Sequence, residues 1–409
     1  MRDDDRMFDV IVWGASGFTG RLVVEYLLEH YPPGKGLRWA VAGRSKAKLQ
    51  QLFESLDEGI ARPAIIIADS HDRDSLEQIA ASTSVILTTV GPYAKYGSEL
   101  VAACVRNGTD YCDLCGEVQW MRQMIDEHQA AAELSGARIV MSCGFDSIPS
   151  DMGLWFLQRH ARERYGRTCA EVILLVRAMK GGASGGTYAS MLNAIEQARQ
   201  DTSIARVLAD PYALNPPGMR EGLDGPDQRG AAYNAAAETW TAPFVMAAVN
   251  TRVVRRSHAL QDYPYGKDFR YCEATITGPG VAGRIKALLM TAGLSLFMIA
   301  SAFRFTRQNI IRRLLPEPGE GPSKQQRENG YFNMLLLGKL PDGEMIRVRV
   351  KGDRDPGYGS TSKMLAESAV SLAKDQAITG GGFWTPSTAL GPSLLTRLGN
   401  NAGLSFEVE

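Results

Sequence analysis

Residues 10–20, VIVWGASGFTG, decide the fold of this chain. The apolar run over residues 10–13 predicts a buried strand, and residues 21–30 carry apolar side chains at helical spacing. A strand, a glycine-rich turn and a helix form the first half of a dinucleotide-binding unit. The glycine spacing is GxxGxxG rather than GxGxxG, and glycines also close loops that bind nothing. The strand before the turn and the helix after it favour the binding interpretation.

Each glycine of this turn has an expected task. Gly14 permits the sharp turn, Gly17 lets a pyrophosphate approach the backbone, and Gly20 lets the helix pack closely on the strand. The N–H groups and the positive dipole end of the helix then face the phosphates. The candidate cofactor residues in this turn are Gly14, Ser16, Gly17, Phe18, Thr19 and Gly20.

The end of the second predicted strand, residues 37–42, indicates which dinucleotide binds. NAD-dependent enzymes usually carry Asp or Glu here to accept from the ribose 2′-hydroxyl. This chain has Arg44, Ser45 and, one turn later, Lys48, which suit a 2′-phosphate and predict NADP. Ser45 is also a candidate N-cap for the helix predicted over residues 46–56, and both roles can hold together. The alternative for Arg44 is a solvated loop charge.

Further strands are predicted over residues 64–68, 85–90, 110–113 and 137–142, alternating with helices. This alternation predicts an α/β fold with a doubly wound parallel sheet in a Rossmann domain over residues 1–150. Asp69, after the third strand, is expected beside the adenine. Four residues at the end of the fourth strand and in the turn that follows are expected at the crevice that holds the nicotinamide half: Thr89, Val90, Gly91 and Pro92.

The pattern changes after residue 150. Strands are predicted over residues 171–179, 269–276, 331–337 and 344–350, with few helices between them. We therefore expect an inserted α+β domain over residues 151–354, with a mixed or antiparallel sheet that serves substrate binding or dimerisation. Residues 355–409 are expected to pack back on the Rossmann domain.

Three residues are candidates for proton transfer. Tyr93 follows the fourth strand, and Asp146 and Ser147 follow the sixth, so all three come after carboxyl ends of strands. The alternatives are a core tyrosine with a satisfied hydroxyl and an aspartate that caps the helix starting near residue 151.

Composition excludes several classes of protein. Lys plus Arg and Asp plus Glu are both 45, so no global charge attracts nucleic acid. Six scattered cysteines suit a reducing compartment, and Cys112 and Cys115 lack the second pair that a zinc ribbon needs. The five histidines form no metal-binding motif, so we expect no metal. The acidic N-terminus is not a signal peptide, which predicts a cytoplasmic protein.

One apolar run, residues 287–303, complicates this picture. It contains no charge and is slightly shorter than a bilayer span requires. The alternatives are a buried core helix, a helix lining an acyl-chain tunnel, a helix lying on or dipping into a membrane, and a helix that spans the membrane. The basic residues that follow, Arg304, Arg307, Arg312 and Arg313, suit anionic headgroups or a solvated helix face.

Several segments together resemble a known family. GASGFTG, AGRS, TTVGPY, NGTDYCDLCGE, SCGFDSIPSD and GGFWTPSTALG occur in an order and spacing similar to the saccharopine dehydrogenase-like oxidoreductases, in particular their trans-acting enoyl reductase branch. The resemblance covers nearly the whole chain. It implies an NADP-binding Rossmann domain, an inserted domain, a returning C-terminal segment, and reduction of a carbon–carbon double bond in an acyl chain carried by a partner protein. Cys112 and Cys115 depart from the family pattern.

The leading hypothesis is an NADPH-dependent reductase of an acyl thioester in lipid or polyketide biosynthesis. It would be cytoplasmic, in peripheral contact with the inner membrane face through residues 287–303, and a homodimer. One alternative is a saccharopine-reductase-like amino-acid oxidoreductase, for which Lys180, Arg252 and Arg255 are available to bind a polyanion. The other is a non-catalytic NADP-binding scaffold at a lipid surface.

Overall fold

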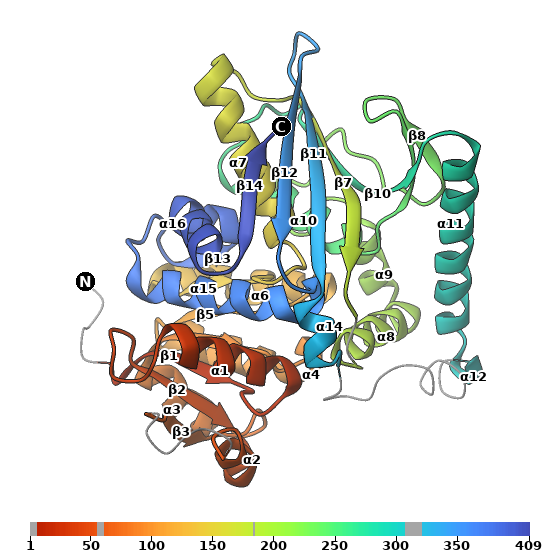
Figure 1. The fold of residues 1–409 in the computed structure, drawn as a ribbon. Coiled ribbons are helices and arrows are strands. Elements are labelled where there is room, and N and C mark those ends of the chain that lie inside the picture. Colours follow the sequence, from red (N-terminus) through yellow and green to blue (C-terminus); the bar gives the residue numbers. More distant parts are fainter. Residues whose placement is uncertain (1–5, 55–60, 183–184, 307–320) are drawn as a thin grey trace. The chain divides into compact units, whose positions relative to one another are not determined.

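The computed structural model describes residues 6–54, 61–182, 185–306 and 321–409 (Figure 1). The chain forms two compact units: Met1–Phe145 with Tyr358–Ala402, and Asp146–Gly357 with Gly403–Glu409. The first stretch of the first unit ends at Phe145, and residues 358–402 complete this unit. The predicted C-terminal segment, residues 355–409, is divided between the two units.

The first unit is built on a parallel sheet with the strand order β13-β6-β5-β4-β1-β2-β3. Its central strands are buried because helices cover both faces, and Val10, Ile11 and Val12 have no exposed surface. The sheet confirms the predicted doubly wound α/β fold and adds a seventh strand from the C-terminal part of the chain. The strands are β1 (Phe8–Trp13), β2 (Trp39–Gly43), β3 (Ala64–Ile67), β4 (Thr83–Thr88), β5 (Asp110–Cys112), β6 (Arg138–Val140) and β13 (Gly382–Trp384).

Two helical layers cover this sheet, as the contacts between elements show. One contains α1 (Phe18–His30), α15 (Thr361–Lys374) and α16 (Pro386–Asn400), and the other contains α3 (Arg73–Ser82), α5 (Ser98–Arg106) and α6 (Val118–Ser135). The short helices α2 (Lys46–Gln51) and α4 (Tyr93–Tyr96) follow β2 and β4.

A buried carboxylate ties the first of these layers together. Glu367 on α15 accepts hydrogen bonds from the hydroxyls of Tyr26 (2.7 Å) and Tyr31 (2.8 Å) and lies 3.4 Å from the guanidinium of Arg397 on α16. Burial and the carboxylate charge both raise the pKa values of the two tyrosines, so they remain hydroxyl donors. The returning segment is thus bound to α1 by charge-assisted hydrogen bonds.

The second unit is built on a mixed sheet with the order β14-β12-β11-β7-β10-β9-β8. Only the β7–β10 pair is parallel in this sheet. Four of its strands match predicted strands, and three short ones were not predicted. The strands are β7 (Glu171–Lys180), β8 (Ala232–Asn234), β9 (Thr239–Pro243), β10 (Arg270–Gly278), β11 (Tyr331–Lys339), β12 (Met345–Gly352) and β14 (Leu404–Val408).

Helices α7 (Ile148–Tyr165) and α10 (Ala247–Leu260) contact one another and the strands of this sheet. Helix α9 (Thr202–Ala209) and strand β8 lie between β7 and β9 in the chain. The remaining helices of the unit are α8 (Gly185–Gln200), α11 (Gly280–Ala302), α12 (Arg304–Thr306) and α14 (Lys324–Glu328), and a π-helical turn, Pro356–Ser360, leads to α15.

Helix α11 contains most of the apolar run 287–303, and it is not a core helix (Figure 1). It is long and apolar enough to cross a membrane by length and composition, yet only 11% of its most apolar window is buried. The buried-core alternative is therefore wrong. Close packing fixes the start of the helix, because a Cβ on Gly283 would lie 1.8 Å from the carbonyl oxygen of Gly278.

Replacing Glu367 tests the packing of the returning segment. Glu367→Ala removes the acceptor of two buried hydroxyls, so we expect the free energy of unfolding to fall by about 3 kcal/mol. Urea denaturation followed by circular dichroism measures this loss. Glu25→Ala, at an exposed position of α1, is the matched control and should change stability by less than about 0.5 kcal/mol. Equal stability of the two variants would contradict the assignment.

Candidate functional site

The turn between β1 and α1 has the backbone shape that its glycines predict. Gly14 has φ +84°, a conformation that favours glycine, and a Cβ there would lie 2.5 Å from Cγ2 of Val90. A Cβ on Gly20 would lie 2.2 Å from the carbonyl oxygen of Gly14. Side chains at either position would push the helix, the strand and the neighbouring turn apart.

Gly17 is the exposed N-cap of α1, and no side chain caps the helix there. The first turn of α1 also lacks acidic residues. Such a helix start is suited to a phosphate, whose charge the dipole and the free N–H groups favour. Ser16 and Thr19 are partly exposed beside it, and the ring of Phe18 packs edge-on against Tyr358 at 5.1 Å.

The turn after β4 is bonded to the glycine turn. The N–H of Thr89 donates to the carbonyl of Trp13 (3.1 Å), and the Thr89 hydroxyl donates to the carbonyl of Gly14 (3.3 Å). Val90 and Pro92 are partly exposed and Gly91 is exposed, which leaves backbone open next to the turn. The structure therefore brings together the residues after β1 and those after β4.

The end of β2 carries the predicted basic residues. Arg44 and Lys48 are both exposed, and the part of the chain that the structure describes contains no ion pair for either. The Ser45 hydroxyl accepts from the N–H of Lys48 (3.3 Å), so Ser45 is the N-cap of α2, one of its two expected roles. Asp69 accepts from the N–H of His71 (2.9 Å) in a local turn after β3.

Together these features fit NADP. The glycine turn leaves space beside the backbone that a Cβ would fill. The uncapped start of α1 offers N–H donors to a pyrophosphate. Arg44 and Lys48, which form no ion pair with the described residues, offer positive charge to a 2′-phosphate. The roles of the individual residues remain predictions.

The side chain of Tyr93 is buried and hydrogen-bonded to the backbone. Its hydroxyl donates to the carbonyl of Thr88 (3.3 Å) and accepts from the N–H of Leu114 (3.4 Å), and its own N–H donates to Glu117 (2.8 Å). Burial raises the pKa of Tyr93 well above its usual value, which makes it a poor acid. These contacts do not favour its use as a proton donor.

Asp146 and Ser147 open the second unit. Burial raises the pKa of the Asp146 carboxyl to about 7, with no hydrogen bond or charge from the described residues opposing the shift. Ser147 is the buried N-cap of α7 and has φ 148°, a strained conformation for a serine. Asp146 therefore does not cap α7, which was one of its alternatives.

Two residues that sequence reasoning missed hold Ser147. The hydroxyl of Ser147 donates to Oδ1 of Asn250 (3.3 Å), and Nδ2 of Asn250 donates to Oε2 of Glu273 (2.9 Å). The hydroxyl of Tyr271 donates to the other oxygen of Glu273 (2.8 Å). All four are buried. The available signal was Glu273, the one acidic residue in the strand predicted over residues 269–276.

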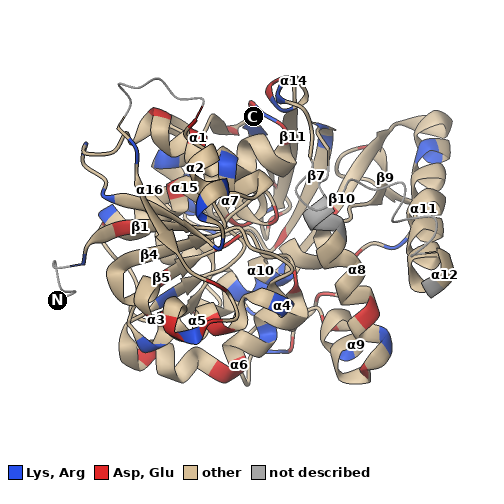
Figure 2. Ribbon diagram, turned by 90° about the horizontal axis from the view of Figure 1, so that it is seen from below, with Lys and Arg blue, Asp and Glu red and all other residues tan. Residues whose placement is uncertain are grey.

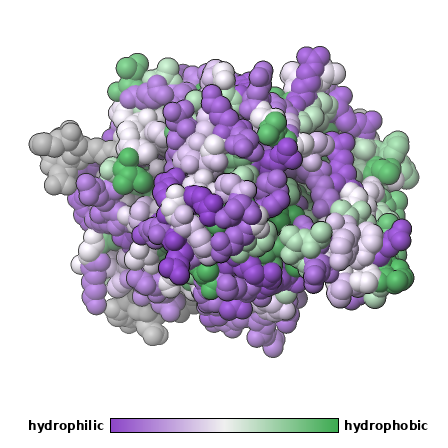
Figure 3. Space-filling model, turned by 90° about the horizontal axis from the view of Figure 1, so that it is seen from above, coloured by the Kyte–Doolittle hydropathy of each residue, from purple (hydrophilic) through white to green (hydrophobic). Residues whose placement is uncertain are grey.

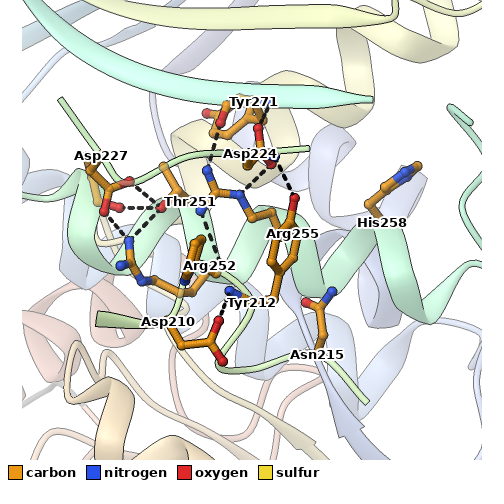
Figure 4. A network of polar contacts seen from close by, with 12 residues as sticks. Asp210, Tyr212, Asn215, Asp224, Asp227, Thr251, Arg252, Arg255, His258 and Tyr271 are labelled. Carbon is orange, nitrogen blue, oxygen red and sulfur yellow. Dashed lines mark hydrogen bonds and ion pairs between the residues drawn. The ribbon is translucent and has the colours of Figure 1, made fainter. Parts of the chain in front are cut away.

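Arg252 and Arg255, which an amino-acid reductase would need to bind a polyanionic substrate, already form ion pairs within the protein (Figure 4). Arg252 pairs with Asp227, and Nε of Arg255 lies 2.7 Å from the carboxylate of Asp224 while its Nη2 donates to the carbonyl of Tyr271 (3.0 Å). Both arginines are buried, and these pairs bind the segment before β8 to α10. A buried, paired guanidinium is not free to bind a substrate carboxylate.

Cys112 and Cys115 have a structural environment. Cys112 and Cys115 are free thiols and buried, and burial raises the pKa of Cys112 well above its usual value. Within residues 6–54, 61–182, 185–306 and 321–409, the structure contains no group of three His, Cys, Asp or Glu side chains that could hold a metal ion.

Comparison with known proteins agrees with this site. A model of the saccharopine dehydrogenase NADP binding domain matches residues 10–140. A protein of Mycobacterium tuberculosis (strain ATCC 25618 / H37Rv), provisionally named a trans-acting enoyl reductase, is 40% identical over 412 residues, covering 98% of this chain and 97% of that protein. The trans-acting enoyl reductase of Mycobacterium ulcerans (strain Agy99) is 37% identical over 97% of each chain.

Among solved structures, apo saccharopine dehydrogenase (L-Glu forming) from Saccharomyces cerevisiae is similar in fold. The TM-score is 0.52 at 14% sequence identity, covering 98% of this chain and 99% of that chain. At this identity the likeness supports the fold alone.

The fold and the site define an NADP-dependent oxidoreductase of the saccharopine dehydrogenase type. Within that class, the chain belongs to the family of the trans-acting enoyl reductases, since it matches them over nearly its full length. The predicted family and the predicted cofactor, NADP, are thereby confirmed.

Reversing the charge at Arg44 tests the 2′-phosphate site. Because Arg44→Asp removes a cation and adds an acceptor for a ribose hydroxyl, we expect the preference for NADPH over NADH to fall by about 10- to 100-fold. Fluorescence titration with each cofactor gives the two Kd values. Arg73→Asp, an exposed arginine of the same unit, is the control and should leave the ratio unchanged. Equal affinity of the wild type for both cofactors would count against this role.

The protonation of Glu273 should appear in the pH dependence of stability. Burial raises its pKa to about 7, while hydrogen bonds from Asn250 and Tyr271 partly oppose the shift. A raised pKa stabilises the fold below the unfolded pKa of 4.5, and this contribution is lost as pH rises through about 7. The free energy of unfolding of the wild type should therefore fall between pH 5 and 8, relative to Glu273→Gln, by up to roughly 3 kcal/mol.

Urea unfolding at both pH values measures this difference. Glu344→Gln, at an exposed position, should keep the wild-type slope. A Glu273→Gln variant with that same slope would show that Glu273 is ionised in the folded protein at neutral pH.

Proposed function

We propose that this protein reduces the carbon–carbon double bond of an acyl thioester with NADPH, on a chain carried by a separate carrier protein. The observation that carries the proposal is the 37–40% identity to proteins named trans-acting enoyl reductase over 97% or more of this chain. The NADP-binding turn, with Arg44 at the end of β2, supplies the matching cofactor chemistry.

Bound NADPH would supply a hydride to one carbon of the double bond, leaving NADP⁺, and a proton reaches the other carbon. The chain must therefore hold the cofactor, orient the acyl group and supply that proton. The turn at Gly14, Gly17 and Gly20 holds the pyrophosphate, and Arg44 with Lys48 neutralises the 2′-phosphate.

Asp146 is the proton donor that we propose. A carboxyl with a pKa of about 7 is protonated in a large fraction of molecules at neutral pH, as a general acid requires. Ser147, held through Asn250 by Glu273, fixes the backbone next to this carboxyl. Asn250 and Glu273 are then positioning residues that act through Ser147.

The environment of Arg252 and Arg255 disfavours the amino-acid reductase alternative. Their ion pairs with Asp227 and Asp224 already use the buried charge that a dicarboxylate substrate would need. We further propose that the protein acts in lipid or polyketide biosynthesis in the cytoplasm, at the inner face of the membrane. The apolar surface of α11 supports a location near lipid.

An enoyl reductase assay tests the proposal. Purified protein is mixed with NADPH and 2-enoyl thioesters on coenzyme A, on a short pantetheine mimic and on an acyl carrier protein. We expect NADPH oxidation with formation of the saturated acyl chain, fastest on the carrier protein. Tight NADPH binding without oxidation of any enoyl thioester would instead favour the non-catalytic scaffold, and oxidation with an amino acid and a carbonyl compound would favour the amino-acid reductase.

Asp146→Asn should lower kcat by about 100-fold, because the amide cannot donate the proton. The wild-type rate should fall as pH rises above about 7, where the carboxyl of Asp146 ionises, and the variant should lose this pH dependence. Steady-state rates between pH 5 and 9 measure both effects. Asp268→Asn, an exposed aspartate of the same unit, is the control. Wild-type activity in Asp146→Asn would eliminate this donor.

A further inference from the structure

Helix α11 presents an apolar face on the side opposite to the one that it packs. Gly283 and Ala287 are buried, whereas Ile285, Leu289 and Leu296 are 52%, 67% and 68% exposed. At 100° per residue these three exposed side chains lie on one face, turned away from the buried glycine and alanine. This is the reverse of a helix at the surface of a water-soluble fold, which turns its polar side outward.

This surface is long and continuous. The helix has 23 residues and is therefore about 34 Å long at 1.5 Å per residue. After Lys286 the sequence contains no charged residue until Arg304. Exposed Phe303 and Phe305 extend the apolar surface beyond the helix end, and hydrophobic atoms gather on the right-hand edge of Figure 3. The other exposed apolar residues of α11 are Val281, Leu288, Met290, Met298 and Ile299.

The charges that flank this helix in the sequence are all positive. Between Ala274 and Pro316 the sequence has six basic residues and no Asp or Glu. Two of them, Arg284 and Lys286, are exposed near the start of α11, where Figure 2 shows basic residues on an otherwise uncharged helix. The others flank its end in the sequence, and Arg307, Arg312 and Arg313 lie outside the described residues. An apolar helix with basic ends suits an anionic lipid surface.

We propose that α11 lies in the plane of an anionic membrane, with its outward face inserted at the boundary between headgroups and acyl chains. The residue types favour lipid over a protein partner, because the surface contains Leu, Ile, Val, Met and Phe but neither Trp nor Tyr. Protein interfaces concentrate their binding energy in Trp, Tyr and Arg and under-represent Leu.

Contacts at both ends of the helix favour lying over crossing. At its start, the hydroxyl of Thr277 donates to the carbonyl of Gly283 (2.9 Å), and the guanidinium of Arg284 lies 5.3 Å from the ring centre of Trp240 on β9. Near its end, Ser301 is buried. A helix held to its own unit at its start and near its end can lie in the plane of a membrane without losing these contacts.

Vesicle flotation tests the proposal without relying on the proposed reductase activity. The full chain is mixed with vesicles of phosphatidylcholine alone or with phosphatidylglycerol added. We expect binding to the anionic vesicles that weakens with added salt, and at least about tenfold weaker binding by Leu289→Glu/Leu296→Glu. The control Leu134→Glu/Leu223→Glu replaces two other exposed leucines and should bind as the wild type does.

The replaced side chains are exposed, so both double variants should keep the melting temperature and the NADPH affinity of the wild type. Lack of binding by the wild type to anionic vesicles would overturn the proposal, as would equal binding by Leu289→Glu/Leu296→Glu. A wild-type dimer that this variant converts to a monomer, with no vesicle binding by either, would show that a second copy covers the face.

Discussion

The close approach of α1 to β1 is the constraint on which the first unit depends. A Cβ on Gly20 would lie 2.2 Å from the carbonyl oxygen of Gly14, so the helix can pack at this distance only with glycine there. The same Gly14 lies against Thr89 and Val90, whose turn is bonded back to β1. The packing of α1 on β1 therefore also positions the turns after β1 and β4, which form the cofactor site. The stability of the first unit and its binding of the cofactor thus depend on the same few backbone atoms.

In the second unit, polar residues are held in place by hydrogen bonds in the buried interior, not by a local turn of the chain. Ser147, Asn250 and Glu273 lie far apart in the sequence and contact one another in the buried interior, where each unsatisfied polar group would be costly. Burial also keeps the pKa values of Asp146 and Glu273 near neutrality. The buried ion pairs of Arg252 and Arg255 have a different role. Their partners, Asp227 and Asp224, hold the segment before β8 against α10.

Local patterns explain what could be predicted. The apolar run at residues 10–13, the glycine turn and the basic residues after β2 are contiguous, so the sequence alone indicates the Rossmann domain and its cofactor. The strands β8, β9, β13 and β14 have only three to five residues, and their pairing depends on partners distant in the chain. Asn250 could not be predicted for the same reason. Composition shows that α11 is an apolar helix, but only packing shows that its apolar side chains face outward.

The last strands of the chain have a consequence for how the protein is made. β13 and β14 are edge strands of different sheets, and each follows all the other strands of its sheet in the chain. The C-terminal Glu409 also pairs with Arg177, at 2.6 Å, beside the second sheet. Neither unit can complete its sheet before these strands, which follow the other strands of their sheets in the chain, have been synthesised. Until those two strands have been synthesised, the neighbouring strands β6 and β12 each present an unpaired edge to which another chain could bind.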